Sequence, residues 1–406
     1  MPIIESLLDT DFYKFTMGYL AYILYPNVSV KYAFRNRTTK VRLADVIDEG
    51  RLREELDYIM ILRFQDNELD YLASIKRADG RPLFTPNFLG FLKGVSLPEY
   101  HLETRDGQFV LEFSGPWATA IYWETLALSI INELYYCAQE DVDIRDVVAV
   151  GTDNLNGKIR LLSARPDIKF SDFGTRRRFS RIWQEFVIWK LKEELQNNFV
   201  GTSNVALAKR FGLKPIGTMA HEEDMVYSGI FHGSDDEIRA SHNKVLQDWQ
   251  SVYAPDLLIA LTDTYGSDFF FRDMTRDQTD CWTGLRHDSG DPIEFGEKAI
   301  KFYESHGVDP RQKVLVFSDG LEVETILRIA DYFKDRIQVS FGWGTNLTND
   351  VGFGTLSLVV KVVEANGHGT VKLSDNLAKA MGSPEDIERF KRIFGHNITT
   401  LEECKY

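Results

Sequence analysis

Seven short apolar runs recur between residues 168 and 345, and this repeat constrains the fold more than any other feature of the chain. Each run ends in small or polar residues, and most are followed by a helical pattern. Repeated strand-then-helix units are typical of a parallel sheet with right-handed crossovers. Seven units in about 190 residues favour a barrel, which can be irregular, over an open sheet. The runs cover residues 168–174, 199–204, 215–218, 257–263, 284–290, 314–320 and 339–345.

The two ends of the chain carry a different pattern. Asp9 or Thr10 can cap a helix that stops at Pro26, and alternation over Val28–Arg35 predicts a strand. Alternation returns over Leu356–Val362, so we expect the tail to pair with the N-terminal domain. Further helices are predicted over Val41–Leu62 and Asp66–Ala73 and from Pro116 through Leu134, and further strands near His101–Leu102 and Phe109–Gly115.

The predicted fold class is therefore α/β, with two domains. An irregular (β/α) barrel over residues 141–349 carries the active site. An α/β domain over residues 1–140 is completed by residues 350–406, so it is built from both chain ends.

Charge and composition narrow the function classes. The formal charge of −14 argues against nucleic acid or an anionic membrane as the main partner, although a pocket can still be locally basic. The N-terminus lacks a basic segment followed by an apolar core, and no apolar run approaches membrane-spanning length. The three cysteines are far apart and form no disulfide framework. We expect a cytoplasmic protein.

Polar side chains stand at the ends of all seven apolar runs. In a barrel the carboxyl ends of the strands form the active face. Each of these residues alone has an ordinary explanation as a helix cap or turn residue, and His221 alone as a satisfied histidine at a strand end. Their recurrence predicts a site. The residues are Asp172, Ser203, His221, Asp263, Arg286, Asp288, Asp319 and Thr345.

Three of these strand ends have the chemistry of phosphate loops. Ser289 and Gly290 precede Asp291-Pro292, a helix cap followed by a first-turn proline, where backbone N–H groups bind anions. Ser318-Asp319-Gly320 and Gly344-Thr345 repeat the arrangement. A plain turn with a cap explains any one of them equally well. Three together favour a substrate with more than one phosphate.

Carboxylates among phosphate loops imply a cation. Asp263, Asp288 and Asp319 offer the oxygen ligands that suit Mg²⁺. Arg176 follows Phe173-Gly174-Thr175, which places a guanidinium beside an aromatic ring at a strand end. That pair suits a planar anionic ligand, although the basic run could also be a solvated helix face.

Taken together, these motifs strongly resemble the nicotinate phosphoribosyltransferase family, in its bacterial form, over essentially the whole chain. The most specific are Asp172-Phe173-Gly174-Thr175-Arg176-Arg177-Arg178, Gly201-Thr202-Ser203-Asn204, Gly217-Thr218-Met219-Ala220-His221-Glu222, Leu285-Arg286-His287-Asp288-Ser289-Gly290-Asp291-Pro292 and Phe317-Ser318-Asp319. The resemblance implies a type II phosphoribosyltransferase that joins nicotinate to 5-phosphoribosyl 1-pyrophosphate. It also implies coupled ATP hydrolysis, Mg²⁺ and a homodimer with shared active sites.

The resemblance also implies roles for residues. His221 takes a phosphoryl group from ATP, with Asp263 and Asp288 beside it. The proximity of the motifs, rather than the resemblance, suggests that Asp263 or Glu222 orients its ring. Phe173 contacts one face of the pyridine ring, and Tyr13, which comes from the partner subunit, contacts the other. Arg176, Ser203, Thr218 and Arg286 surround nicotinate. The phosphoribosyl pyrophosphate is held by Ser289, Gly290, Ser318, Asp319, Gly344 and Thr345, with Arg35, Lys361 and Lys379 reaching across the interface.

Two alternatives stay open. Nicotinamide phosphoribosyltransferase has the same architecture, but it carries an aspartate where Ser203 stands, and an aspartate would repel the carboxylate of nicotinate. Ser203 therefore favours the acid as substrate. The other alternative is a catalytically inert relative that binds nicotinate or a nucleotide. The complete set of proposed catalytic residues argues against it.

Overall fold

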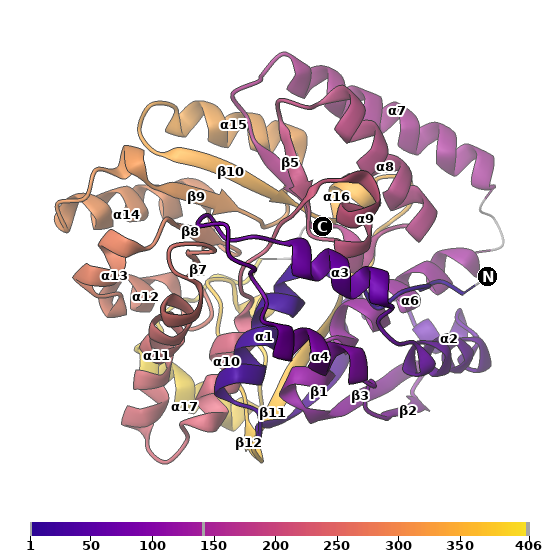
Figure 1. Cartoon of the computed structure of the whole chain (residues 1–406), viewed down its shortest axis with the longest axis horizontal. Coiled ribbons are helices and arrows are strands. Elements are labelled where there is room, and N and C mark those ends of the chain that lie inside the picture. Colours follow the sequence, from indigo (N-terminus) through magenta and orange to yellow (C-terminus); the bar gives the residue numbers. More distant parts are fainter. Residues whose placement is uncertain (1, 140–142, 403–406) are drawn as a thin grey trace.

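In the computed structural model, which describes residues 2–139 and 143–402, the strands form two separate sheets (Figure 1). One sheet is antiparallel and draws its strands from both ends of the chain. It consists of β1 (Ser29–Asn36), β2 (Tyr100–Arg105), β3 (Gln108–Pro116), β11 (Leu358–Ala365) and β12 (His368–Gly369). The other sheet is parallel and consists of β4 (Phe170–Asp172), β5 (Phe199–Thr202), β6 (Lys214–Pro215), β7 (Ile259–Leu261), β8 (Gly284–His287), β9 (Val314–Phe317) and β10 (Gln338–Trp343).

The parallel sheet curls into a half-barrel. Its strand order is β6-β5-β4-β10-β9-β8-β7, and every neighbouring pair is parallel. Strands β6 and β7 form its two edges, so the sheet does not close. The irregular barrel predicted from the strand-then-helix repeat is confirmed. The run at 215–218 is the weakest unit, because only Lys214 and Pro215 pair there.

The antiparallel sheet joins the two chain ends. Strand β1 lies between β3 and β11, with Ala33 opposite Lys361 and Phe34 opposite Val360. The predicted return of the tail to the N-terminal domain is thus confirmed, and so is the α/β fold class. The domain boundary predicted at residues 140 and 141 lies outside the described residues, and the boundaries themselves stay predictions.

Helices pack around both sheets. They are α1 (Phe12–Leu24), α2 (Glu49–Ile61), α3 (Asp66–Ser74), α4 (Pro86–Gly94), α5 (Trp117–Ala120), α6 (Trp123–Cys137), α7 (Ile144–Ser163), α8 (Arg181–Glu194), α9 (Val205–Phe211), α10 (His221–Ile230), α11 (Asp235–Tyr253), α12 (Ser267–Asp273), α13 (Arg276–Cys281), α14 (Pro292–Ser305), α15 (Val323–Phe333), α16 (Thr345–Thr348) and α17 (Pro384–Phe394), with 3₁₀ turns η1 (Leu43–Asp45), η2 (Thr175–Arg177), η3 (Pro310–Gln312) and η4 (Leu377–Lys379).

Three helix predictions need correction, and one helix was missed. Helix α1 has Asp11 at its N-cap, rather than Asp9 or Thr10, and the Asp11 side chain makes no capping hydrogen bond. The segment predicted as one helix over Val41–Leu62 divides into η1 and α2, because Asp48 caps a new helix by accepting from the backbone N–H of Arg51. The helix expected from Pro116 divides into α5 and α6. Helix α4 was not predicted, although Thr85 caps it and Pro86 occupies its first turn.

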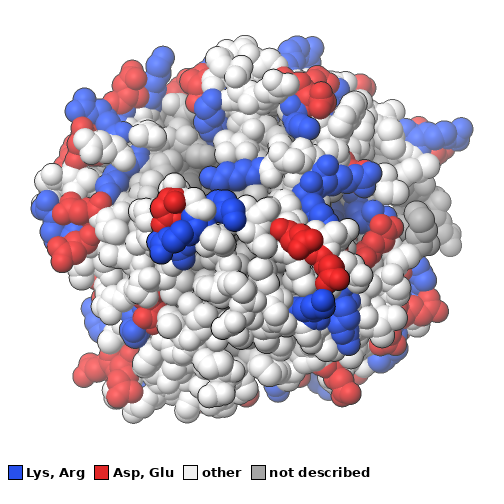
Figure 2. All heavy atoms as spheres, viewed as in Figure 1, with Lys and Arg blue, Asp and Glu red and all other residues white. Residues whose placement is uncertain are grey.

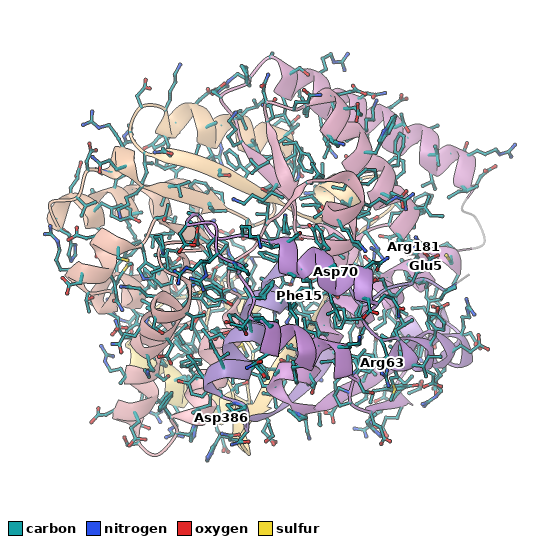
Figure 3. All side chains as sticks on the ribbon, viewed as in Figure 1. Glu5, Phe15, Arg63, Asp70, Arg181 and Asp386 are labelled. Atoms are coloured by element: carbon teal, nitrogen blue, oxygen red, sulfur yellow. The ribbon has the colours of Figure 1, made fainter. Side chains whose placement is uncertain are left out.

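The N-terminal segment is tied to the half-barrel by side chains as well as by α1. Figure 3 labels Glu5 beside Arg181, and their ion pair of 2.7 Å fastens this segment to the start of α8. On the face shown in Figure 2, acidic and basic side chains are interspersed around a broad uncharged area in the lower half of the view. Among the described residues, no helix combines the length and apolar character that a membrane crossing requires.

Candidate active site

His221 is the first residue of α10, and a glycine allows α1 to pack against the segment before it. Gly217 has φ +155, and a Cβ at this position would lie 2.9 Å from the backbone nitrogen of Tyr13. Only a residue without a Cβ permits this approach. The contact fixes the path of residues 217–220 and places the His221 side chain, 4% exposed, beside the carboxyl ends of β7 and β8.

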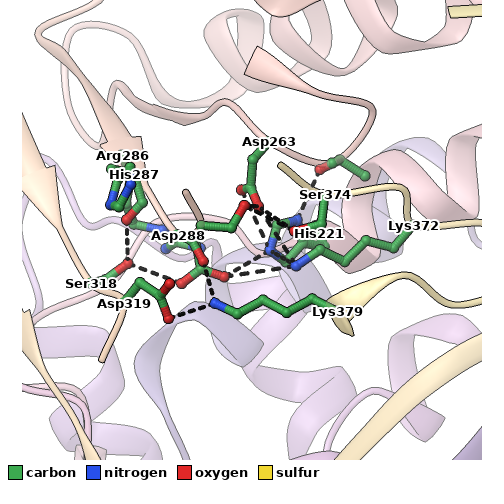
Figure 4. A network of polar contacts seen from close by, with 12 residues as sticks. His221, Asp263, Arg286, His287, Asp288, Ser318, Asp319, Lys372, Ser374 and Lys379 are labelled. Atoms are coloured by element: carbon green, nitrogen blue, oxygen red, sulfur yellow. Dashed lines mark hydrogen bonds and ion pairs between the residues drawn. The ribbon is translucent and has the colours of Figure 1, made fainter. Parts of the chain in front are cut away.

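The His221 ring has partners on both nitrogens (Figure 4). Its Nδ1 lies 3.0 Å from Thr264 Oγ1, and its Nε2 lies 2.8 Å from Lys372 Nζ and 2.9 Å from Asp288 Oδ2. Burial, followed by the positive charge of Lys372, lowers the pKa of His221 to about 4. The imidazole is therefore neutral near pH 7, which leaves one ring nitrogen with a free lone pair.

Two of the three predicted metal carboxylates lie beside this ring. Ligand atoms of His221, Asp263 and Asp288 all fall within 4.8 Å of one another. Asp263 Oδ1 is buried and has no hydrogen-bond partner among the described residues. A buried carboxylate oxygen without a hydrogen-bond donor is available to bind a cation. Carboxylate oxygens of this kind fit Mg²⁺. Asp319 does not join the group, because its carboxylate pairs with Lys379 Nζ at 2.5 Å.

Most of the predicted binding residues line a single cavity. Its lining combines the aromatic and cationic side chains of Tyr13, Phe173, Arg176 and Arg286 with residues of two of the predicted phosphate loops, at 318–320 and 344–345. Strand ends and the C-terminal segment meet here, as Figure 4 shows for β8, β9 and residues 372–379. The predicted residues that line it are Tyr13, Phe173, Arg176, His221, Arg286, Asp288, Ser318, Asp319, Gly344, Thr345, Lys361 and Lys379.

The arginines in the cavity lining, Arg176 and Arg286, suit a small planar ligand that carries a carboxylate. Arg176 is 31% exposed, and its guanidinium lies 5.9 Å from the centre of the Tyr13 ring. Glu124 and Asp11 hold it in place at 3.2 and 3.7 Å. Arg286 donates from Nη1 to the Met219 carbonyl oxygen, while its buried Nε has no partner among the described residues. Two cations beside an aromatic ring can bind a carboxylate and stack the ring that bears it.

Of the three predicted phosphate turns, the one at Asp291-Pro292 has the predicted helix cap, whereas no side chain caps α15 or α16. Asp291 caps α14 by accepting from the backbone N–H groups of Ile293 and Glu294, and Pro292 follows it. Helix α15 begins at Val323 with Glu322 at its N-cap, so Ser318-Asp319-Gly320 precedes the helix without capping it. Gly344 is the N-cap position of α16.

Several predicted site residues support the cavity without lining it. Ser203 Oγ donates to Asp11 Oδ1 at 2.5 Å, and Thr218 Oγ1 donates to the Ile259 carbonyl oxygen at 3.2 Å. Ser289 Oγ donates to Asp263 Oδ2 at 2.5 Å. The residues in this supporting set are Ser203, Thr218, Asp263, Ser289 and Gly290.

Four residues were predicted to reach the site across a subunit interface. Arg35 lies exposed on β1 and does not line the cavity of its own chain, whereas Arg37 does. Tyr13, Lys361 and Lys379 were expected to reach the site from a partner subunit, but in the structure they line the cavity of their own chain. The homodimer therefore stays a prediction without support from this cavity.

Some site residues were not recognised in the sequence. Lys372 and Thr264 contact the His221 ring, and Ser374 Oγ donates to Asp263 Oδ2 at 3.2 Å. Thr264 directly follows Asp263, so a polar residue just after a strand end was the available signal. The ring orientation expected from Glu222 is wrong, because Glu222 binds Lys14, Tyr32 and Trp117.

Comparison with known proteins identifies a family. The nicotinate phosphoribosyltransferase (NAPRTase) family model matches residues 168–398, and the model of the NAPRTase N-terminal domain matches residues 8–132. A nicotinate phosphoribosyltransferase from Porphyromonas gingivalis is 34% identical, with TM-score 0.86, covering 97% of this chain and 100% of that chain.

Two further solved structures are similar over nearly the whole chain. The nicotinate phosphoribosyltransferase from Vibrio cholerae is 32% identical, with TM-score 0.86 and coverage of 99% of this chain and 95% of that one. A putative nicotinate phosphoribosyltransferase from Saccharomyces cerevisiae is 30% identical, with TM-score 0.86 and coverage of 98% and 99%. The chain belongs to the nicotinate phosphoribosyltransferase family.

Proposed function

We propose that this enzyme joins nicotinate to 5-phosphoribosyl 1-pyrophosphate and couples the reaction to ATP hydrolysis through a phosphorylated His221. The observation that carries the proposal is the neutral, buried His221 ring in the wall of the cavity that also holds Phe173, Arg176 and the phosphate loops. A phosphoryl acceptor and a binding site for a planar carboxylate therefore share one space.

The condensation needs positioning and charge stabilisation. The ring nitrogen of nicotinate bonds to the anomeric carbon while the bond from that carbon to pyrophosphate breaks, and pyrophosphate leaves with the electron pair. Arg176 and Arg286 hold the carboxylate, so the ring nitrogen points away from them, into the cavity that Ser318 and Thr345 also line. Lys361 and Lys379 supply positive charge in the same cavity, where negative charge grows on the leaving group.

The ATP half of the reaction uses the lone pair of His221. The lone pair on Nε2 attacks the γ-phosphorus, the bond from phosphorus to the bridging oxygen breaks, and ADP leaves with the electron pair. Water later cleaves the P–N bond and releases phosphate. Asp263 and Asp288 would hold Mg²⁺, which neutralises substrate phosphates when bound. Lys372, 2.8 Å from Nε2, lies where it can donate to a transferred phosphoryl group.

The choice between nicotinate and nicotinamide rests on the two arginines. Ser203 was predicted to favour the acid because it replaces an aspartate, but it donates to Asp11 and does not line the cavity. Arg176 and Arg286 do line it, and a guanidinium binds a carboxylate with two charge-assisted hydrogen bonds that an uncharged amide cannot match. These residues favour the acid.

The test compares wild type with His221→Ala, using nicotinate or nicotinamide with and without ATP. We expect His221→Ala to abolish nicotinate-dependent ATP hydrolysis while some uncoupled nicotinate mononucleotide synthesis survives. His101→Ala, a change of an exposed histidine on β2, serves as the matched control and should behave as wild type. Full ATP stimulation in His221→Ala would refute the phosphohistidine. Preferred turnover of nicotinamide would refute the substrate assignment, and binding without turnover would favour an inert relative.

A further inference from the structure

Thr264 connects the catalytic histidine to a second buried carboxylate that no step of the proposed reaction uses. His221 Nδ1 lies 3.0 Å from Thr264 Oγ1, and Thr264 Oγ1 lies 2.6 Å from Asp224 Oδ2. The three side chains are nearly inaccessible, with exposed fractions of 4%, 1% and 3%. At such burial, each polar contact is a defined hydrogen bond because water does not compete for it.

The direction of both hydrogen bonds follows from proton counting. A threonine hydroxyl has one proton, and an ionised carboxylate only accepts. Thr264 therefore donates to Asp224, and its oxygen is left to accept from Nδ1–H of His221. In the neutral ring the proton then sits on Nδ1, and the lone pair sits on Nε2, beside Lys372.

Neighbouring hydrogen bonds fix the positions of both Asp224 and Thr264. Asp224 is three residues after His221 on α10, so the two side chains share one face of the helix. The backbone carbonyl oxygen of Asp224 accepts from the Tyr265 hydroxyl at 3.0 Å. The carbonyl oxygen of Thr264 accepts from the backbone N–H of Leu373 at 2.8 Å, next to Lys372.

Other carboxylates near His221 are not placed for this role. Asp263 and Asp288 approach the ring from the Nε2 side, at 3.7 and 2.9 Å. Glu222 follows His221 directly but is engaged by Lys14 and Tyr32. Among the described residues, Thr264 is the group that hydrogen-bonds Nδ1.

We propose that Asp224, acting through the Thr264 hydroxyl, is a positioning residue that selects the Nδ1–H tautomer of His221 and directs phosphorylation to Nε2. When Nε2 takes the phosphoryl group, the proton stays on Nδ1 and the ring becomes positively charged. The chain from Nδ1–H through Thr264 to the Asp224 carboxylate stabilises that charge. This inference rests on the proposed phosphorylation of His221.

The first test requires no variant. Wild-type enzyme is phosphorylated with ATP, and the isomer of phosphohistidine is identified by ³¹P and ¹⁵N NMR under denaturing alkaline conditions. We expect the Nε2 isomer. The Nδ1 isomer would overturn the proposal, whereas absence of phosphohistidine together with retained ATP hydrolysis in His221→Ala would refute the proposed function itself. The two failures are thus distinguishable.

The second test uses matched variants with steady-state ATP hydrolysis as the readout. Thr264→Val keeps the shape but removes the hydroxyl, and we expect roughly a 10- to 100-fold loss of kcat with little change in the KM for nicotinate. Thr264→Ser should restore the rate. Asp224→Asn keeps an acceptor oxygen without the charge, so its loss should be smaller.

Thr279→Val removes a buried hydroxyl that donates to the Thr275 carbonyl oxygen in α13, and it controls for the structural cost of such a change. It should hydrolyse ATP as wild type does. Wild-type rates in both Thr264→Val and Asp224→Asn would overturn the proposal. So would equal losses in Thr264→Ser and Thr264→Val, because the rescue would then have failed.

Discussion

Lys372 Nζ lies 2.8 Å from His221 Nε2, although 151 residues separate the two side chains in sequence. The same ammonium lies 3.7 Å from Asp263 and 3.9 Å from Asp288. Both partners are almost fully buried, at 5% and 4% exposure. A cation supplied by the C-terminal segment therefore lies between the ring and both carboxylates, and its charge adds to burial in lowering the pKa of His221.

Replacing this cation should change the titration of the histidine. Burial is the first cause of the low pKa of His221, and the charge of Lys372 is the second. We expect Lys372→Met to raise the pKa of His221 above about 4, while burial still keeps it below its ordinary value. NMR titration of labelled histidine measures it. Lys379→Met, which removes the partner of Asp319, is the control and should shift the pKa less. An unchanged pKa in Lys372→Met would contradict the role of its charge.

A second buried lysine joins α1 to the helix that carries the histidine. Lys14 Nζ lies 2.6 Å from Glu124 and 2.5 Å from Glu222, and its side chain is completely inaccessible. Lys14→Met would leave two buried carboxylates without this partner, so we expect it to lower the free energy of unfolding by about 3–5 kcal/mol. Urea unfolding followed by fluorescence measures the change.

Lys93→Met is the matched control for this prediction. Lys93 pairs with Asp66 at 2.7 Å, but both side chains are exposed, and such pairs contribute little to stability. Its unfolding midpoint should be that of wild type. A Lys14→Met protein as stable as the control would show that Glu124 and Glu222 find other partners.

The sequence predicted the parts of this site that depend on strand ends. A parallel sheet brings the carboxyl ends of its strands to one edge, so His221, Asp288 and Ser318 could be grouped before any contact was known. The phosphate turns were predictable for a similar reason, because Asp291-Pro292 is a local helix start. Strand ends and helix starts are determined by local sequence patterns, so they could be predicted from the sequence.

The residues that were missed or misplaced depend on long-range contacts. Lys372 reaches the site because of the path of residues after β12, which has no local signature. Alternation does predict that Arg35 does not face its own chain's cavity, because Phe34 faces the core and Arg35 must point the other way. The subunit origin of Tyr13 depends on how α1 packs, which Gly217 controls from 204 residues away.

The turn after β4 should tolerate no side chain at Gly174. A Cβ there would lie 2.0 Å from Thr348 Oγ1 and 2.5 Å from its Cγ2, although the φ of Gly174 is an ordinary −86°. We therefore expect Gly174→Ala to destabilise the enzyme by about 1–3 kcal/mol through overpacking. It should also raise the KM for nicotinate, because Phe173 and Arg176 flank the glycine.

Gly157→Ala provides the comparison. Gly157 lies within α7, and a Cβ there would meet nothing within 4 Å. Alanine should be neutral or stabilising by up to about 1 kcal/mol in a helix interior. Thermal unfolding and nicotinate kinetics of both variants decide the matter. Equal behaviour of the two would mean that Thr348 moves aside without cost.

Lys361 should make the use of phosphoribosyl pyrophosphate sensitive to pH. Burial is the main cause that lowers the pKa of Lys361 to about 8; nearby Glu124 opposes it and Arg176 adds to it. Below this pKa the ammonium is charged and attracts substrate phosphates; above it the charge is lost. We therefore expect kcat/KM for phosphoribosyl pyrophosphate to fall as pH rises through about 8.

Two variants test whether Lys361 causes this fall. An arginine at position 361 stays charged throughout this pH range, so in Lys361→Arg the fall in kcat/KM should move to higher pH. Lys214→Arg, a change of an exposed lysine, should leave the profile as in wild type. If Lys361→Arg declined at the same pH as wild type, another group, with Lys372 the first to examine, would control the decline.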